Sequence, residues 1–400
     1  MCIDFVLLSS SFYRIKAINC TYYTTHYPPC QYFVHKKYLI NKKYCVFIPS
    51  VLFYTLFYVE YLELGNILLY NQDMNNIFKI SELFTGDTPP VTLAPMAGAS
   101  DRTMRLLCRE YGADLTVSEM VSAKAIHFGD KKTDSLASIT EPERPMAIQL
   151  FGSDPAIMAE AAAAMWERYK PEMIDINMGC PVPKVAGNGD GSALMRDPEK
   201  AGRVMRAVAD SIPCPATAKI RAGWDDNSKN AVEVAKILEA NGAQLICIHG
   251  RTRKQMYAPP VDLDIIAEVV RAVNVPVIGN GGIDNPADAL KMLDVTGCAG
   301  IAVARGACGA PWLFEGIKAA LQGKQWDPPN ASERIDIAIR HLDMMLCDKG
   351  EYTGLREARK QLGWYLHGLR GATSARLKIN TSENPDEVRD ILCSVQKENQ

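Results

Sequence analysis

The chain has 400 residues, of which 48% are hydrophobic and 22% charged, and this length suits one large domain with an appendage or two domains with a tail. The composition excludes a collagen-like or wholly disordered protein. Because the formal net charge is only −2, any contact with nucleic acid must come from a local basic patch. The 12 cysteines are scattered singly, without paired spacing, which predicts a reduced, cytoplasmic protein with no metal site.

The first 73 residues differ in composition from the rest of the chain. They hold seventeen aromatic residues but only one glycine, Gly65, and one alanine, Ala17. The apolar run from Cys45 to Val59 is shorter than the roughly 20 residues of a transmembrane helix, and no cleavage site for a signal peptide follows it. We therefore expect residues 1–73 to be translated upstream sequence, with the functional protein starting at Met74. A membrane anchor and a genuine extension are the alternatives.

From Val91 onward, short apolar runs alternate with helical patterns, which is typical of βα units around a parallel sheet. Asp154-Pro155, Asp197-Pro198 and Asn285-Pro286 each place a capping side chain before a proline that suits the first helical position. The pattern predicts an α/β protein with a (β/α)₈ TIM barrel over residues 74–325, and a doubly wound sheet is the alternative. The eight strand candidates end at Leu93, Val117, Leu150, Ile176, Ile220, Ile248, Ile278 and Val303.

After Ala331 the pattern changes to helices without strand candidates, which predicts a small C-terminal all-helical domain over residues 331–400. The linker is expected at residues 323–330, where consecutive prolines cannot continue a helix. Helical segments are expected near Ser332–Asp348, Leu355–Leu369 and Pro385–Cys393.

Polar residues follow the predicted strands at the end of the barrel where an active site is expected. Gly281 and Gly282 follow the seventh strand and Gly306 the eighth, and glycines let backbone N–H groups approach a phosphate closely. Gln149 and Lys219 would offer an amide and a cation to a polar heteroaromatic ring at the same mouth. Together these features predict a flavin mononucleotide (FMN) site.

Nine short stretches of the sequence carry a family resemblance. They are LAPMAGASDRTMR from Leu93, DINMGCPVPKV from Asp175, GSALM from Gly191, KIRAGW from Lys219, HGRTR from His249, GNGGI from Gly279, ARGACGAPWLF from Ala304, REARKQLGWYLHGLRG from Arg356 and INT from Ile379. In these stretches the chain resembles the tRNA-dihydrouridine synthases, in particular the bacterial B-type, over about residues 74–393. It departs from the family pattern at Gly282, where an acidic residue is common, at Ala304, where glycine is common, and over residues 258–263.

The resemblance implies an oxidoreductase that reduces the carbon 5–carbon 6 bond of specific tRNA uridines, with bound FMN, with NADPH as reductant and with no stable protein partner. It implies that Cys180 is the proton donor, and an inert buried thiol is the alternative. Lys219 or Lys184 would steady the developing negative charge. The flavin contacts that the resemblance implies are Pro95, Met96, Ala97, Gln149, Asn177, Lys219, His249, Asn280, Gly281, Gly282, Ala304 and Arg305.

A basic face of the predicted helical domain is the candidate RNA-binding surface, because the target base must leave the folded tRNA to reach a flavin. An ordinary solvated helix surface is the alternative. Two other functions stay open, a flavin barrel that acts on a free pyrimidine or dihydroorotate and a non-catalytic tRNA-binding protein. The RNA-binding candidates are Arg251, Arg253, Arg356, Arg359, Lys360 and Arg376, with Arg370 and Lys378 near them in sequence.

Overall fold

The computed structural model describes residues 77–130, 133 and 136–400, so that the expectations for residues 1–73 fall outside it. In this part of the chain a parallel sheet closes into a barrel of eight strands, because β2 pairs with both β1 and β4, while the short β3 continues β2 alongside the end of β4. The predicted TIM barrel and its eight strands are confirmed. The strands are β1 (Val91–Leu93), β2 (Leu115–Val117), β3 (Val121–Ser122), β4 (Met146–Phe151), β5 (Met173–Asn177), β6 (Ala216–Gly223), β7 (Leu245–Thr252), β8 (Val277–Asn280) and β9 (Gly300–Val303).

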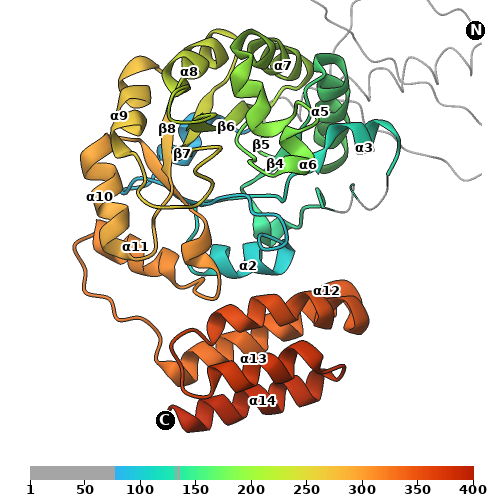
Figure 1. Ribbon diagram of the computed structural model, residues 1–400, viewed down its shortest axis with the longest axis vertical. Helices are drawn as coiled ribbons and strands as arrows, with labels where there is room; N and C mark the ends of the chain where they lie inside the picture. Colours follow the sequence, from blue (N-terminus) through green and yellow to red (C-terminus); the bar gives the residue numbers. More distant parts are fainter. Residues whose placement is uncertain (1–76, 131–132, 134–135) are drawn as a thin grey trace, which may run out of the picture. The chain divides into compact units, whose positions relative to one another are not determined.

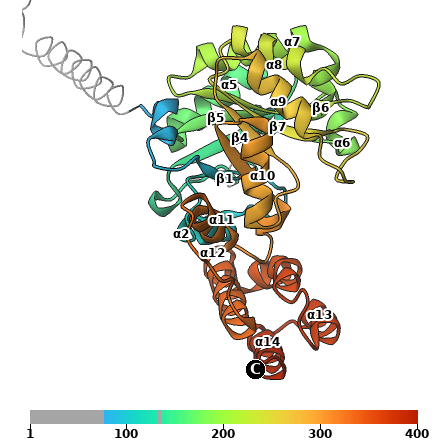
Figure 2. The same cartoon turned by 90° about the vertical axis from the view of Figure 1, so that its left-hand side faces the viewer.

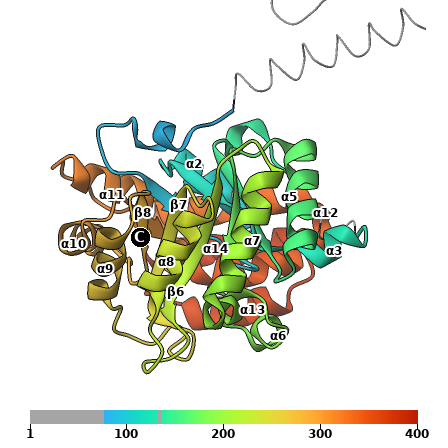
Figure 3. The ribbon, with the colours of Figure 1, turned by 90° about the horizontal axis from the view of Figure 1, so that it is seen from above.

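Helices connect the strands and surround the barrel (Figures 1 and 3). Asp154, Asp197 and Asn285 cap three of them by accepting hydrogen bonds from backbone N–H groups of the first turn, as the sequence predicts. The α-helices are α2 (Arg102–Glu110), α3 (Ala123–His127), α5 (Pro155–Tyr169), α6 (Pro183–Ala186), α7 (Pro198–Ser211), α8 (Ala231–Ala240), α9 (Leu263–Ala272), α10 (Pro286–Thr296) and α11 (Leu313–Leu321). Short 3₁₀ helices are η1 (Ile80–Phe84), η2 (Glu141–Glu143), η3 (Gly191–Arg196) and η4 (Arg305–Ala307).

Alternation along the strands decides which side chains face the barrel interior. On β5, Ile174 and Ile176 pack in the main core, whereas Asp175 and Asn177 point to the opposite face. The same alternation on β6 turns Lys219 inward. Polar side chains from neighbouring strands therefore gather inside the barrel, near the carboxyl ends of the strands.

Apolar side chains close the opposite end of the barrel. Leu83 of η1 is buried there and packs with the inward-facing Leu115, Ala147 and Ile278. Burying one leucine side chain contributes roughly 1.5–3 kcal/mol to folding. The polar groups of the interior are thus shielded from water on this side and face the other end.

Three helices follow the barrel and share an apolar core of their own (Figures 1 and 2). They are α12 (Ala331–Tyr365), α13 (Ala372–Thr381) and α14 (Pro385–Glu398). Gly350, with φ +75°, kinks α12 between the first two helical segments that the sequence predicts. The separate α13 is not predicted, because it buries only Ala372, Ala375 and Ile379 and so carries a weak apolar pattern. Within the described residues, no helix has the length and apolar character needed to cross a membrane.

Candidate active site

A cavity of about 870 Å³ lies between the carboxyl ends of the strands and the helices α12 and α13. Barrels of this type carry their active sites at this end, and ligand pockets commonly measure roughly 300–1,000 Å³. Cys180 lines the cavity together with every residue expected to contact a flavin. These residues are Pro95, Met96, Ala97, Gln149, Asn177, Lys219, His249, Asn280, Gly281, Gly282, Ala304 and Arg305.

The register of the sheet brings the inward polar side chains together. β4 pairs with β5 so that Gln149 lies beside Asp175, and β5 pairs with β6 so that Asn177 lies beside Lys219. His249 on β7 has partners on both β6 and β8. Consecutive strands therefore supply amides, a carboxylate, an ammonium and an imidazole to the interior of the barrel.

A chain of hydrogen bonds runs from these inward polar groups to the loop that carries Cys180. Asp175 accepts a hydrogen bond from Gln149 Nε2 at 2.7 Å, and Gln149 Oε1 accepts one from Asn177 Nδ2 at 2.8 Å. The backbone N–H of Cys180 donates to Asn177 Oδ1 at 2.9 Å. Asp175 is itself held in place, because it is buried and also accepts a hydrogen bond from Thr217 at 2.7 Å. This series of hydrogen bonds therefore fixes the position of the loop that carries Cys180.

The Cys180 thiol is half-buried and faces the cavity. Burial raises the pKa of Cys180, although the Val182 N–H and the Arg221 guanidinium act in the opposite direction. Gly191 lies directly against the loop, where a Cβ would sit 3.1 Å from the Cys180 Cβ. Cys180 is therefore a neutral, proton-bearing thiol at neutral pH.

Positive charge surrounds His249. Burial lowers the pKa of His249, and Lys219, Arg221, Arg251 and Arg305 lower it further, so the imidazole is neutral. An Arg251 guanidinium nitrogen lies 3.1 Å from Nε2 of His249. Since guanidinium groups only donate hydrogen bonds, Nε2 accepts and Nδ1 carries the proton. His249 is thus a neutral group in a cavity whose charge favours an anion.

Two lysines are candidates for stabilising negative charge on a bound substrate. Lys219 lines the cavity, and its Nζ donates to Asn280 Oδ1 at 2.9 Å. Lys184 is exposed on α6 and is not among the lining residues. The geometry therefore favours Lys219.

The glycines after β8 and β9 are required by close packing. A Cβ on Gly281, which has φ +114°, would lie 2.7 Å from Cδ2 of His249, and one on Gly306 would lie 2.2 Å from a backbone oxygen. Gly282 also has a positive φ of +67°. These loops present backbone to the cavity, as anion sites need. Gly282 stands where the family commonly has an acidic residue, but the cavity does contain a carboxylate, because Asp284 lines it two residues later.

The RNA-binding candidates divide into two groups. The guanidinium carbon of Arg356 lies 4.0 Å from the centre of the Tyr352 ring, and that of Arg253 lies 4.7 Å from the centre of the Trp224 ring. Neither arginine belongs to the cavity lining. The other four do line the cavity, and three of them come from α12 and α13. These four are Arg251, Arg359, Lys360 and Arg376.

The sequence places Arg221 with Lys219 among the polar residues at the end of the fifth predicted strand but assigns Arg221 no role. Arg221 follows Lys219 by two positions on β6, so strand alternation puts both on the inner face, and Arg221 lines the cavity. Arg221 is 3% exposed, burial lowers its pKa to about 10, and it donates to the carbonyl of Gly179 at 2.6 Å. It thereby braces the backbone next to Cys180.

Aromatic residues also line the cavity without having been predicted. Tyr257 is 47% exposed and lies between two guanidinium groups, with Arg221 at 5.7 Å and Arg305 at 4.8 Å from its ring centre. Trp364 follows Lys360 by one helical turn, and Nζ of Lys360 lies 5.4 Å from the centre of the Trp364 ring. That spacing is the signal that could have identified Trp364.

Comparison with known proteins places this arrangement in a family. The model of the family described as Dihydrouridine synthase (Dus) matches residues 92–400. The chain belongs to the dihydrouridine synthase family. It is 40% identical over 304 residues to a probable tRNA-dihydrouridine synthase of Rickettsia conorii, covering 76% of this chain and 92% of the relative. A probable tRNA-dihydrouridine synthase of Rhodobacter capsulatus is 46% identical over 281 residues, with 69% and 86% covered. The tRNA-dihydrouridine synthase B of Pseudomonas aeruginosa is 39% identical over 295 residues, with 74% and 89% covered.

The family name defines the type of reaction. Dihydrouridine carries two more hydrogens than uridine across one carbon–carbon bond, so a dihydrouridine synthase is an oxidoreductase that acts on a CH–CH group. The matched region starts within β1 and includes α12, α13 and α14. Every residue that lines the cavity therefore lies within the family region.

Proposed function

We propose that this chain reduces specific uridines of tRNA to 5,6-dihydrouridine, using bound FMN, reducing equivalents from NADPH, and Cys180 as the proton donor. The main support for the proposal is that the neutral thiol of Cys180, the glycine loops and Lys219 all line one cavity. The printed names of the relatives support tRNA as the substrate. A free-pyrimidine enzyme would have no need for the cations that α12 and α13 add to the cavity wall.

The lining of the cavity fits a flavin mononucleotide. The close-packed glycines Gly281 and Gly282, with Ala304 and Arg305, would hold its phosphate by backbone N–H groups and one guanidinium. Gln149 and Lys219 would contact the polar edge of the ring. When bound and reduced, the flavin supplies the hydride for carbon 6 of the uracil.

Cys180 would complete the reduction by donating its proton to carbon 5. Negative charge develops on the uracil carbonyl as hydride is added, and a positioned acid and a nearby cation both lower the barrier. The raised pKa of Cys180 keeps the proton on sulfur, and Lys219 is fixed in the cavity by Asn280. The thiolate left behind lies near Arg221, which favours it until solvent returns the proton.

The proposed acid predicts an unusual pH dependence. Because burial raises the pKa of Cys180 above its usual value, proton donation should persist beyond the range of an ordinary thiol. In single-turnover reactions of the reduced enzyme with tRNA, we expect the rate to stay constant from about pH 7 to about pH 9 and to fall only above that. A fall centred at about pH 8.5 or lower would contradict the role of a buried neutral thiol.

The helical part of the chain would hold the RNA. A uridine inside folded tRNA must leave its stack to enter the cavity, and flanking phosphates then need cations at the mouth. Arg359 and Lys360 of α12 and Arg376 of α13 line that mouth. We therefore propose residues 74–325 as the catalytic domain and residues 331–400 as the tRNA-binding domain.

The cofactor can be identified directly. Protein purified from cells and then heated should release a yellow chromophore that co-migrates with FMN in liquid chromatography, at about one equivalent per chain. Adding NADPH to the intact protein should bleach its flavin absorbance. Release of FAD, or a colourless protein that does not bind added FMN, would reject the proposed cofactor.

A further inference from the structure

The loop between β1 and α2 lies between the proposed cofactor site and helix α12. Its first part, Pro95–Ala97, lines the cavity, and the loop is folded into a tight turn by hydrogen bonds between Met96 and Ser100 of 2.8 and 2.9 Å. The N–H of Gly98 donates to the carboxylate of Glu119, which follows β2. We call residues 95–101 the cofactor loop.

Asp101 ends the cofactor loop and ties it to both halves of α12. Its Oδ1 accepts from the Met104 N–H at 3.1 Å and so caps α2, while Oδ2 accepts from Gln361 at 3.1 Å and from the Lys349 ammonium. Lys349 and Gln361 lie on opposite sides of the kink at Gly350. A single carboxylate, 9% exposed, therefore fixes the start of α2 against the kinked helix.

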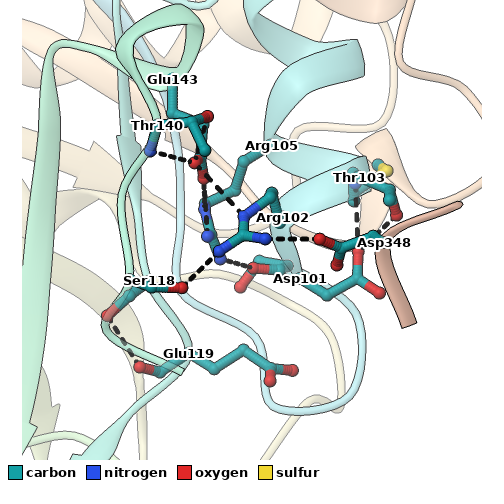
Figure 4. Close-up of polar contacts among 12 residues, drawn as sticks. Asp101, Arg102, Thr103, Arg105, Ser118, Glu119, Thr140, Glu143 and Asp348 are labelled. Carbon is teal, nitrogen blue, oxygen red and sulfur yellow. Dashed lines mark hydrogen bonds and ion pairs between the residues drawn. The ribbon is translucent and has the colours of Figure 1, made fainter. Parts of the chain in front are cut away.

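Further polar contacts surround this carboxylate (Figure 4). Arg102 forms an ion pair with Asp348 of α12. Thr103 lies 3.1 Å from the buried His341, measured between Oγ1 and Nε2. Lys349 also pairs with Glu357 at 2.7 Å. The contact between α2 and α12 is thus a connected polar cluster.

A second cofactor-lining loop rests on the same helix. A Cβ on Gly309, after β9, would lie 2.5 Å from the backbone of Trp364, which shows how closely this loop approaches α12. On the cofactor loop, a Cβ on Gly98 would lie 3.7 Å from Nζ of Lys360. The helix that carries proposed RNA contacts therefore touches the two loops that would hold the flavin.

We propose that Asp101 and Lys349 are positioning residues, whose ion pair holds the cofactor loop in the conformation that binds flavin. The same ion pair fixes the position of this loop relative to the face of α12 that would bind RNA. This inference rests on the proposed function. The alternative is that the pair only caps α2 and stabilises the fold. The two can be separated because Asp101→Asn keeps a capping oxygen for Met104 but removes the charge that pairs with Lys349.

The test measures FMN binding by fluorescence quenching and tRNA reduction in steady state, both well below the unfolding temperature. Asp101→Asn and Lys349→Gln should each raise the FMN dissociation constant about tenfold and raise KM for tRNA more than they lower kcat. Lys349→Arg should restore FMN binding to within about threefold of the parent, since it keeps the charge. The double variant should be no worse than the worse single variant, because the ion pair is already lost in each single variant.

The matched control is the ion pair between Arg340 and Glu110, which joins the same two helices at 2.7 Å but is about half exposed. Arg340→Gln should leave FMN affinity and KM within about twofold of the parent, since exposed pairs contribute little. If Asp101→Asn and Lys349→Gln lower the melting temperature yet match Arg340→Gln in both measurements, the positioning role is overturned. If the parent itself binds no FMN, the proposed function fails and this inference fails with it.

Discussion

Replacing Cys180 with alanine is expected to lower the rate of dihydrouridine formation about 10²- to 10⁴-fold, the range typical of removing a general acid. Alanine removes the proton but leaves the backbone N–H that donates to Asn177, so the loop keeps its anchor. FMN affinity and the rate of flavin reduction by NADPH should therefore stay close to those of the parent. The measurement is a single-turnover reaction of reduced protein with unmodified tRNA.

A second thiol provides the matched control for this variant. Cys308 also lines the cavity, and burial raises its pKa to about 11, but it lies in the loop after β9, away from the chain of hydrogen bonds that starts at Asp175. Cys308→Ala should retain tRNA reduction to within about threefold. Equal losses in the two variants, or full activity in Cys180→Ala, would show that Cys180 is not the proton donor.

Replacing Gly281 with valine is expected to yield protein that binds FMN poorly. The new Cβ would lie 2.7 Å from Cδ2 of His249, at a φ of +114° that side chains rarely adopt, so the loop must shift. Overpacking of this kind costs about 1–3 kcal/mol, which corresponds to roughly 5- to 150-fold in the dissociation constant if the cost falls on the bound state. Fluorescence titration of FMN measures it.

Gly297 gives a control that also has a positive φ but no crowding. It ends α10 with φ +65°, and a Cβ there would meet nothing within 4 Å. Gly297→Ala should lower the free energy of unfolding by about 1 kcal/mol without changing FMN affinity. If Gly281→Val binds FMN as tightly as Gly297→Ala does, the loop after β8 is not part of the flavin site.

The barrel could be predicted from the sequence because its strands are buried on both faces. Such strands appear as short apolar runs, and the polar residues after them mark the end where the site lies. The capping residues before Pro155, Pro198 and Pro286 fixed three helix starts independently of those runs. Strand alternation was also sufficient to bring Gln149 and Lys219 into one cavity.

Features that depend on long-range packing could not be predicted in this way. The contact between Asp101 and Lys349 joins residues 248 positions apart, and no local pattern specifies it. The same holds for the wall of the cavity that α12 and α13 contribute, including Trp364. Arg253 and Arg356 counted as basic candidates by sequence, but their stacking on aromatic rings outside the cavity lining is visible only in the folded chain.

The most direct test of the central claim is mass spectrometry of tRNA after incubation with the purified protein, FMN and NADPH. Unmodified tRNA transcripts should gain about two mass units at one or a few defined uridines, and Cys180→Ala should abolish most of this gain. The account would be contradicted if the parent protein binds FMN and oxidises NADPH, yet no uridine in any tRNA tested gains the two hydrogens.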